Sequence, residues 1–221
     1  MKVVIADAGP LIALARIGQL QLLPALFGEV SITQQVAAEL VGGGSFPDSA
    51  DLQKALGQAW LKTVDLESGP KLAKGTDSMA QCRDLMNLHQ IDLGEASALV
   101  YAAQCQSKGN AALLVMDDFR GRVAAKVEGV AVLGTAGLLL LAKQTRLINA
   151  VNPLLVALRQ NGYFLSDRLI SLAGAAKMAN ESIGVMLTRL ARLDVPVADY
   201  DTPTLADEVE AARAWVATPV K

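Results

Sequence analysis

The sequence contains few of the residues that build metal clusters, disulfide frameworks or aromatic stacking surfaces. Its 221 residues include two cysteines and one histidine, and aromatic side chains account for only 4%. The single histidine, His89, cannot form a zinc site alone, and so few aromatics argue against a platform on which single-stranded RNA would stack. The apolar stretch at the N-terminus is broken by Asp7, too early for a signal peptide. We therefore expect no export, a cytoplasmic location, and reduced thiols at Cys82 and Cys105.

Long hydrophobic runs and an excess of one charge are also missing. The best candidate for a membrane span, from Val130 to Ala142, contains Gly134, Thr135 and Gly137 and is shorter than the roughly 18 residues that a span needs. We expect it to be a buried strand followed by a core helix. The 20 Lys and Arg residues nearly balance 22 Asp and Glu, for a net charge of −2. This balance argues against a protein that coats nucleic acid non-specifically, but it allows a nuclease with a local basic rim.

Short apolar or β-branched runs alternate with longer helical patterns, which is typical of parallel strands joined by crossover helices. The predicted strands are Val3–Ala6, Glu29–Thr33, Leu61–Val64, Leu113–Met116 and Val130–Leu133. One predicted helix begins near Pro10, and the others cover residues 34–41, 91–106, 119–127, 136–143 and 153–159. The polar stretch 65–90 is expected to be a loop with one or two short helices. The sequence thus predicts an α/β fold with a central parallel sheet.

Strand signals stop near Ser166. The remainder is predicted to be helical, with an acidic amphipathic stretch from Leu205 to Trp215. Apolar residues recur at helical spacing before it, at Met178, Ile183, Met186, Leu187 and Leu190. We therefore predict two domains, residues 1–166 and a helical extension of residues 167–221.

Acidic residues follow the predicted strands, at the edge where open parallel sheets bind ligands. Asp7 comes directly after the first strand, and Glu39 lies in the helix after the second. Glu95 opens the long central helix, and Asp117 and Asp118 follow the strand at 113–116. Four separate segments are therefore predicted to bring carboxylates toward one edge of the sheet.

Each of these acidic residues also has a purely structural explanation. Asp7 would serve as a helix cap, and Glu39 as a surface residue at the border of an apolar stripe. Glu95 fits a capping box in which Asp92 is the N-cap. Asp118 suits the N-cap of the helix at 119–127, which leaves the aspartate before it redundant for that role. Capping and catalysis do not exclude each other.

Carboxylates that are brought together without a basic partner repel one another, so such a cluster is costly unless a cation binds. Mg²⁺ and Mn²⁺ prefer oxygen ligands of this kind. A bound ion of this type lowers the pKa of an attacking water and neutralises developing charge, which suits phosphodiester hydrolysis. Arg120 and Arg122 follow the acidic pair directly and would contact a phosphate backbone from the rim, with surface solvation as the alternative.

Several segments resemble, in order and spacing, the motifs of a PIN-like nuclease domain of the VapC-type toxin subfamily. They read VVIADAGPLIALARIG, VAAEL, DLGEASALVYA, and LLVMDDFRGRVAA followed by GTAGLLLLAK. The resemblance covers about residues 2–167 and implies a three-layer α/β/α sandwich and an Mg²⁺- or Mn²⁺-dependent endoribonuclease. By position, it implies the acidic set Asp7, Glu39, Glu95 and Asp117, with Asp118 as a further metal ligand. Gly9 departs from the pattern, since many PIN domains have a hydroxyl or amide side chain there.

The segment that begins near Leu169 resembles the later part of small helix-turn-helix antitoxins, which are often encoded beside such toxins. The resemblance implies a toxin-like domain joined to an antitoxin-like segment. The predicted amphipathic helices of this segment, with Arg189 and Arg192, lead to the hypothesis that it covers the acidic site, in the same chain or in a dimer mate. The PIN-like resemblance implies an RNA substrate, a homodimer and a cognate antitoxin, and the lack of a long apolar run indicates no membrane partner. Alternatively, residues 167–221 only extend the core or a dimer interface. A different kind of function is also open: a PIN-fold binding or regulatory module whose acidic site is silent or covered.

Overall fold

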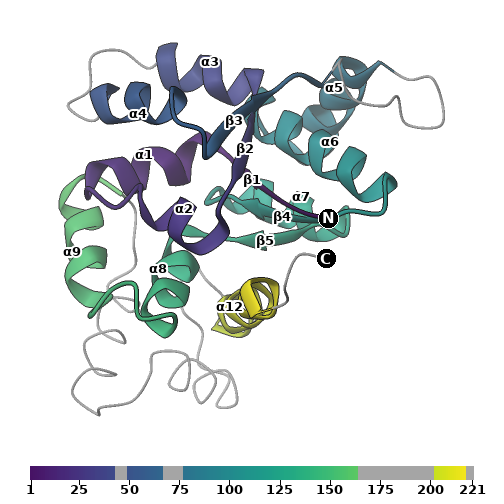
Figure 1. The fold of residues 1–221 in the computed structure, drawn as a ribbon. Helices are drawn as coiled ribbons and strands as arrows, with labels where there is room; N and C mark the ends of the chain where they lie inside the picture. The colour runs from purple at the N-terminus through teal and green to yellow at the C-terminus, as the bar shows by residue number, and fades with distance from the viewer. Residues whose placement is uncertain (43–48, 67–76, 164–201, 218–221) are drawn as a thin grey trace. The chain divides into compact units, whose positions relative to one another are not determined.

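The strands form one parallel sheet in the order β3-β2-β1-β4-β5 (Figure 1). The computed structural model describes residues 1–42, 49–66, 77–163 and 202–217. The strands are β1 (Lys2–Ala6), β2 (Val30–Thr33), β3 (Leu61–Val64), β4 (Ala111–Val115) and β5 (Ala131–Leu133). They are short and largely apolar, as buried parallel strands are.

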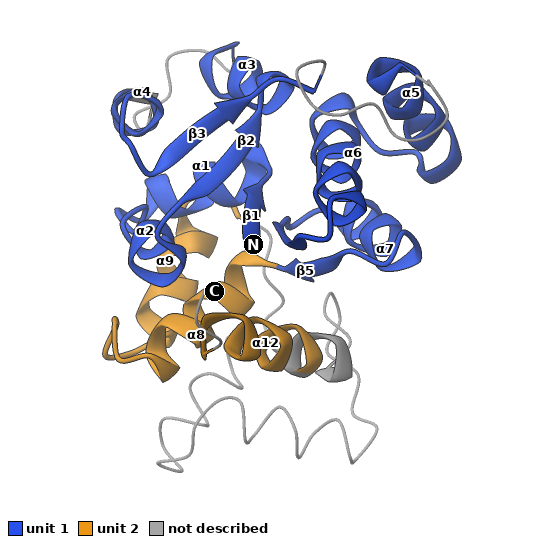
Figure 2. Cartoon of the chain, turned by 45° about the vertical axis from the view of Figure 1, so that its right-hand side comes forward, with its two compact units in different colours: residues 1–133, 219–221 blue, residues 134–218 orange. Residues whose placement is uncertain are grey.

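The helices lie on both faces of this sheet. Because crossovers between parallel strands are right-handed as a rule, the strand order places α1 to α4 over one face and α5 to α7 over the other, and Figure 2 shows α5, α6 and α7 together on one side. The first group is α1 (Ala8–Arg16), α2 (Leu22–Phe27), α3 (Gln34–Gly42) and α4 (Ser49–Leu56). The second is α5 (Ser78–His89), α6 (Leu93–Ser107) and α7 (Phe119–Val127). The predicted α/β fold with a central parallel sheet is confirmed.

The order of the strands reverses between β1 and β4. These two strands pair along their whole length, from Lys2 opposite Ala111 to Ala6 opposite Val115. From β1 the chain builds outward to β2 and β3, and it then returns to place β4 on the other side of β1. In open parallel sheets such a reversal leaves a crevice at the carboxyl ends of the strands. The residues that follow β1 and β4 therefore occupy the position where this architecture binds ligands.

The core on one face of the sheet packs against α5, α6 and α7. Side chains alternate between the two faces of a sheet along each strand. Ile5 of β1 and Leu114 of β4 therefore lie on one face, and Val4 lies on the other. Ile5 and Leu114 belong to a buried cluster with Cys82 of α5 and Leu99 of α6. This packing fixes the start of α6, which carries two of the acidic residues, relative to β1 and β4.

The chain divides into two compact units, residues 1–133 and residues 134–218 (Figure 2). The second unit contains α8 (Thr135–Gln144), α9 (Asn152–Gln160) and α12 (Thr202–Ala217). Within it, the buried carboxylate of Glu208 in α12 accepts a hydrogen bond from the backbone N–H of Gly134, at 3.3 Å. The C-terminal part of the chain is thus helical along α12, as predicted. The predicted boundary near residue 166 and the apolar positions between 178 and 190 lie outside the described residues.

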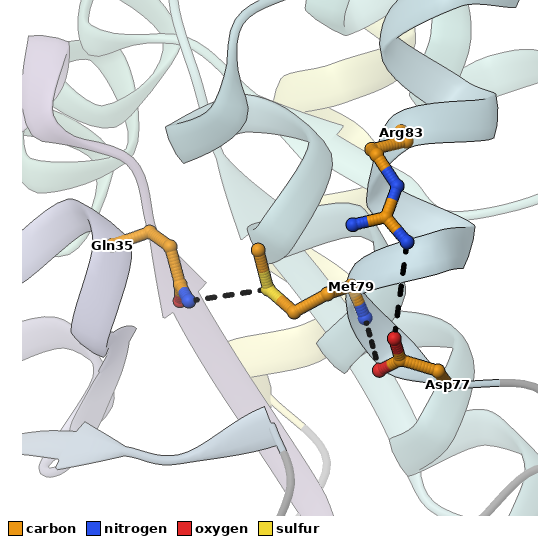
Figure 3. Close-up of polar contacts among 4 residues, drawn as sticks. All are labelled: Gln35, Asp77, Met79 and Arg83. Carbon is orange, nitrogen blue, oxygen red and sulfur yellow. Dashed lines mark hydrogen bonds and ion pairs between the residues drawn. The ribbon is translucent and has the colours of Figure 1, made fainter.

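Two features of the fold differ from the sequence expectations. The short helices α2 and α4 were not predicted, and the expected loop with one or two short helices at 65–90 contains, over its described part, one 12-residue helix, α5. Helix α5 has a polar sequence and buries only Ser78 and Cys82 fully, so its apolar periodicity is weak. Its start is defined by Asp77, whose side chain accepts a hydrogen bond from the N–H of Met79 at 3.0 Å (Figure 3). Among the described residues, no helix is long and apolar enough to cross a membrane.

Candidate active site

Two aspartates follow the central strands at the point of strand reversal. Asp7 follows β1, and its N–H donates to the carbonyl of Val115 at 2.9 Å, which extends the β1–β4 pairing by one bond. Asp117 lies two residues beyond Val115 and is half-buried. Asp7 is only 7% exposed and caps α1, since its Oδ2 accepts from the N–H of Gly9 at 3.4 Å. The backbone therefore brings both aspartates to the same edge, as the sequence predicts.

The first turn of α6 supplies two more carboxylates. Asp92 is the N-cap, and its Oδ1 accepts from the N–H of Glu95 at 2.8 Å. Glu95 completes the capping box, because its Oε2 accepts from the N–H of Asp92 at 3.1 Å. Its other oxygen, Oε1, lies toward α7, 3.4 Å from the place that a Cβ on Gly121 would take. The predicted capping box is confirmed, and it holds the carboxylate of Glu95, a residue that is 6% exposed, in a fixed orientation between α6 and α7.

Gly94 is the point on which the carboxylates converge. A Cβ added to Gly94 would lie 2.9 Å from Oε2 of Glu39, 3.3 Å from Oδ1 of Asp92 and 3.6 Å from Oδ1 of Asp7. The first of these distances is shorter than real Cβ contacts, so only glycine leaves room for Glu39 in this position. Oxygens from α3, from the end of β1 and from the start of α6 thus surround one backbone position.

Burial and mutual repulsion raise the pKa values of three of these carboxyl groups. Burial raises the pKa of Asp7 to about 7, and the charges of Glu39 and Asp92 add to the increase. Burial also raises the pKa of Glu95 to about 8, with contributions from the charges of Asp92, Asp118 and Asp7. The pKa of Glu39 is raised because its carboxylate is partly desolvated and faces Asp92. Glu39 is an exposed residue overall, but its carboxylate reaches inward to Gly94.

The start of α7 brings a further acidic residue and two arginines to this region. Asp118 is exposed and is the N-cap of α7, since its Oδ1 accepts from the N–H groups of Arg120 and Gly121 at 2.7 and 3.0 Å. The predicted cap is confirmed. Arg120 is exposed, and its Nη1 donates to the carbonyl of Gln90 at 3.3 Å. Arg122 is 7% exposed, so its side chain lies inside the fold and not on an open rim.

Asp92 is the member of the cluster that sequence reasoning assigned only to capping. The structure gives it both roles, because its Oδ1 caps α6 and also lies beside Gly94 with Glu39 and Asp7. The sequence feature that indicates this double role is the position of Asp92 three residues before Glu95. The capping box that this spacing forms turns both carboxylates toward the same turn of the helix, so a cap of this kind can also belong to a site.

The chemistry of the cluster fits a hard divalent cation. All of its side-chain donors are carboxylate oxygens, which Mg²⁺ and Mn²⁺ prefer, and a positive charge would relieve the repulsion that raises the pKa values of Asp7 and Glu95. In the part of the chain that the structure describes, however, no three or more His, Cys, Asp or Glu side chains are already arranged as ligands around one ion. The residues fit such an ion in their chemistry, and binding would require the carboxylates to move closer together.

Comparison with known proteins gives one match. A family model described as a PIN domain matches residues 3–176. This match confirms the resemblance to a PIN-like domain, while the VapC-type subfamily and the antitoxin-like character of the C-terminal segment stay predictions. No curated protein and no solved structure matches the chain.

Proposed function

The chain belongs to the PIN-domain family, and from that premise we propose that it is a metal-dependent ribonuclease and the toxin component of a toxin–antitoxin system. PIN domains are generally nucleases, so family membership indicates a nuclease-type hydrolase that acts on nucleic acid. The observation that supports a catalytic site in this chain is the convergence of the Glu39, Asp92 and Asp7 carboxylates on Gly94. Three separate elements supply these oxygens at the sheet edge where such folds bind ligands.

Asp7, Glu39, Glu95 and Asp117 are the residues that would hold Mg²⁺ or Mn²⁺, with Asp118 as a further candidate. A bound ion of this kind lowers the pKa of an attacking water and neutralises the charge that develops on the phosphate. The chain's own contribution is to hold the carboxylates in place. Caps on α1 and α6 orient Asp7 and Glu95, and both residues are buried.

Water is the proposed nucleophile. The side chains that converge on Gly94 are carboxylates. Helix α7, a fourth element in this region, contributes its N-terminal end and the side chain of Arg120. An exposed arginine beside Asp118 is suited to contact a phosphate of the RNA backbone. Arg122 is the second predicted phosphate contact, and its buried position makes Arg120 the better candidate of the two.

Two isosteric variants of the full chain test the catalytic role. Asp7→Asn and Glu95→Gln remove a charge with almost no change in volume, so we expect folded proteins that no longer cleave RNA in the presence of Mn²⁺. Asp84→Asn, at an exposed position on α5, is the matched control and should cleave like the wild type. Full activity in both site variants would refute the proposed mechanism.

Calorimetric titration with Mn²⁺ separates this proposal from a PIN-fold binding or regulatory module. A working site binds the ion in the wild type and in Asp84→Asn, and binds it more weakly in Asp7→Asn and Glu95→Gln. A silent site binds none in any of the four proteins. Absence of both Mn²⁺ binding and RNA cleavage would therefore favour the binding module.

The role as a toxin, and the proposed partners, need experiments on the full chain in cells. Induced expression should slow growth for the wild type and not for Asp7→Asn, and a partner of the chain that restores growth would identify a cognate antitoxin. Light scattering would test the proposed homodimer. If residues 167–221 inhibit the site in the same chain, the purified protein should cleave RNA slowly, and mild proteolysis within that segment should raise the rate.

A further inference from the structure

A chain of buried hydrogen bonds joins the end of β2 to the first turn of α6. Thr33 Oγ1 and Ser97 Oγ lie 2.6 Å apart, although the two residues are separated by 64 positions in the sequence. The N–H of Val36 donates to Thr33 Oγ1 at 3.2 Å, and Ser97 Oγ donates to the carbonyl of Gly94 at 2.7 Å. Both side chains are fully buried. We call Thr33 and Ser97 the hydroxyl bridge.

The direction of each bond in the bridge follows from the number of hydrogens. A hydroxyl group has one hydrogen to donate. Because Ser97 donates its hydrogen to Gly94, the hydrogen between the two hydroxyls must come from Thr33. Thr33 accepts from Val36 and donates to Ser97, so each hydroxyl has both a donor and an acceptor partner. A buried polar network in which every member is satisfied holds its parts rigidly.

The bridge ends at the residue on which the carboxylates converge. Thr33 caps the start of α3, the helix that carries Glu39, and Ser97 holds the carbonyl of Gly94 in α6. Oε2 of Glu39 lies 2.9 Å from the place that a Cβ on Gly94 would take. Since Glu39 is an exposed residue on a short helix, its carboxylate stays beside Gly94 only while α3 keeps its distance from α6.

A second contact joins α3 to the neighbouring helix α5, and it is weaker. Nε2 of Gln35 lies 3.6 Å from the Sδ of Met79 (Figure 3), and a thioether sulfur is a weak acceptor. The same close-up shows that Met79 belongs to the start of α5, where Asp77 and Arg83 form an exposed ion pair. This contact does not reach α6, whereas the hydroxyl bridge connects the start of α3 to the first turn of α6.

We propose that Thr33 and Ser97 are positioning residues of the candidate active site, which set the spacing between Glu39 on α3 and the carboxylates of α6. The proposal rests on the proposed function, because positioning matters only if the cluster binds a cation. Both hydroxyls are fully buried, so the proposed role is to orient the carboxylates and not to contact the ion or the substrate. Partners that orient metal ligands commonly change metal affinity by about 10- to 100-fold when they are removed, so we expect an effect near the lower end of that range.

The chain offers closely matched control variants. Ser107 lies at the other end of α6 and also donates to a carbonyl three residues earlier, that of Gln104, at 2.8 Å. Ser107→Ala therefore removes the same type of bond from the same helix, away from the carboxylates. Thr33→Ser keeps the hydroxyl of the bridge, while Thr33→Val and Ser97→Ala each remove one.

Two measurements on the full-length protein test the proposal. The first is hydrogen exchange without metal: Ser97→Ala should speed the exchange of the amides of α3 from Val36 onward, whereas Ser107→Ala should leave them unchanged. The second is Mn²⁺ titration at a temperature where every variant is folded. Thr33→Val and Ser97→Ala should bind Mn²⁺ about tenfold more weakly, and the double variant no more weakly than either alone. Thr33→Ser and Ser107→Ala should bind like the wild type.

A purely structural role would lower the stability of the variants and leave the Mn²⁺ affinity of the folded protein unchanged, and this result would overturn the proposal. Unchanged exchange of α3 in Ser97→Ala would overturn it as well. If the wild type bound no Mn²⁺, the proposed function would fail, and the bridge between α3 and α6 would still be decided by the exchange rates.

Discussion

Replacing Asp7 with Asn should stabilise the metal-free protein at neutral and alkaline pH. Asp7 is a buried residue, 7% exposed, whose carboxyl group faces the charges of Glu39 and Asp92, and the pKa of this group is raised to about 7. When ionised, it carries a charge that the fold disfavours. Asn has nearly the same shape and is about as good an N-cap as Asp, so it keeps the cap on α1 and removes the charge.

The size of the effect follows from the difference between the folded and unfolded pKa values. The pKa of Asp7 rises from 3.8 to about 7 on folding, and each pKa unit corresponds to about 1.4 kcal/mol. Full ionisation of Asp7 therefore costs the folded state roughly 4 kcal/mol. A buried amide also loses hydration, at a cost of roughly 1–2 kcal/mol. We expect Asp7→Asn to raise the free energy of unfolding by about 2–3 kcal/mol at pH 8.

The effect should depend on pH in a defined direction. Well below pH 4 Asp7 is protonated in both states, so its raised pKa does not lower the stability of the wild type. Between pH 4 and 7 the unfolded chain releases the proton while the folded protein retains it. The folded state then binds more protons, and the free energy of unfolding of the wild type falls as pH rises. The advantage of the variant should therefore grow across this interval and level off above about pH 7.

Urea denaturation in the presence of a chelator, followed by circular dichroism at pH 4.5, 6 and 8, measures this difference. Asp84→Asn changes an exposed aspartate on α5 and should stay within about 0.5 kcal/mol of the wild type at every pH. The reasoning is refuted if Asp7→Asn behaves like this control, or if its advantage does not change between pH 4.5 and 8.

Three further variants or conditions have expected outcomes. Gly94→Ala should raise helix stability by about 0.5–1 kcal/mol. It should also weaken Mn²⁺ binding, because the new Cβ displaces the carboxylate of Glu39. A Cβ on Gly42 would have nothing within 4 Å, so Gly42→Ala should change stability and leave Mn²⁺ binding unchanged. Asp118→Ala should lower the free energy of unfolding by about 1 kcal/mol through loss of the cap on α7, and Asp118→Asn should not. Adding a chelator to Mn²⁺-loaded protein should lower the melting temperature of the wild type, with little change in Asp7→Asn.

The sheet could be predicted because the strands are short runs rich in apolar or β-branched residues, although most predicted bounds differ from the observed ones by one or two residues. Residues 61–64 and 119–127 were predicted with the bounds that the structure has for β3 and α7. Helices α2 and α4 were not predicted: α2 is only six residues long, and α4 is polar, with acidic and basic residues in its two turns. The length of helix α5 was not predicted either, since it has a polar sequence with few buried residues. Helices that are this short or this polar show little hydrophobic periodicity, so the sequence pattern does not reveal them.

The acidic residues of the site could be predicted from topology, because parallel strands bring their carboxyl ends to one edge. The distances between side chains could not. Nothing in the sequence shows that Glu39, from an exposed position on α3, reaches Gly94, or that Thr33 and Ser97 meet across 64 positions. These contacts depend on how α3 approaches α6, which is a tertiary property. The exposure of the two arginines also depends on the rotation of α7, which buries Arg122 and exposes Arg120.

Capping and cation binding at this site are two aspects of one arrangement. Asp7, Asp92 and Asp118 each cap a helix, so backbone N–H groups and the positive end of a helix dipole face each of these carboxylates. This contribution allows acidic side chains to gather at one edge without a basic partner. It does not cancel their repulsion and burial, because the pKa values of Asp7 and Glu95 remain near 7 and 8. The unfavourable energy that remains is what a bound divalent cation would remove, and it explains why the same substitution should stabilise the metal-free protein and weaken its binding of Mn²⁺.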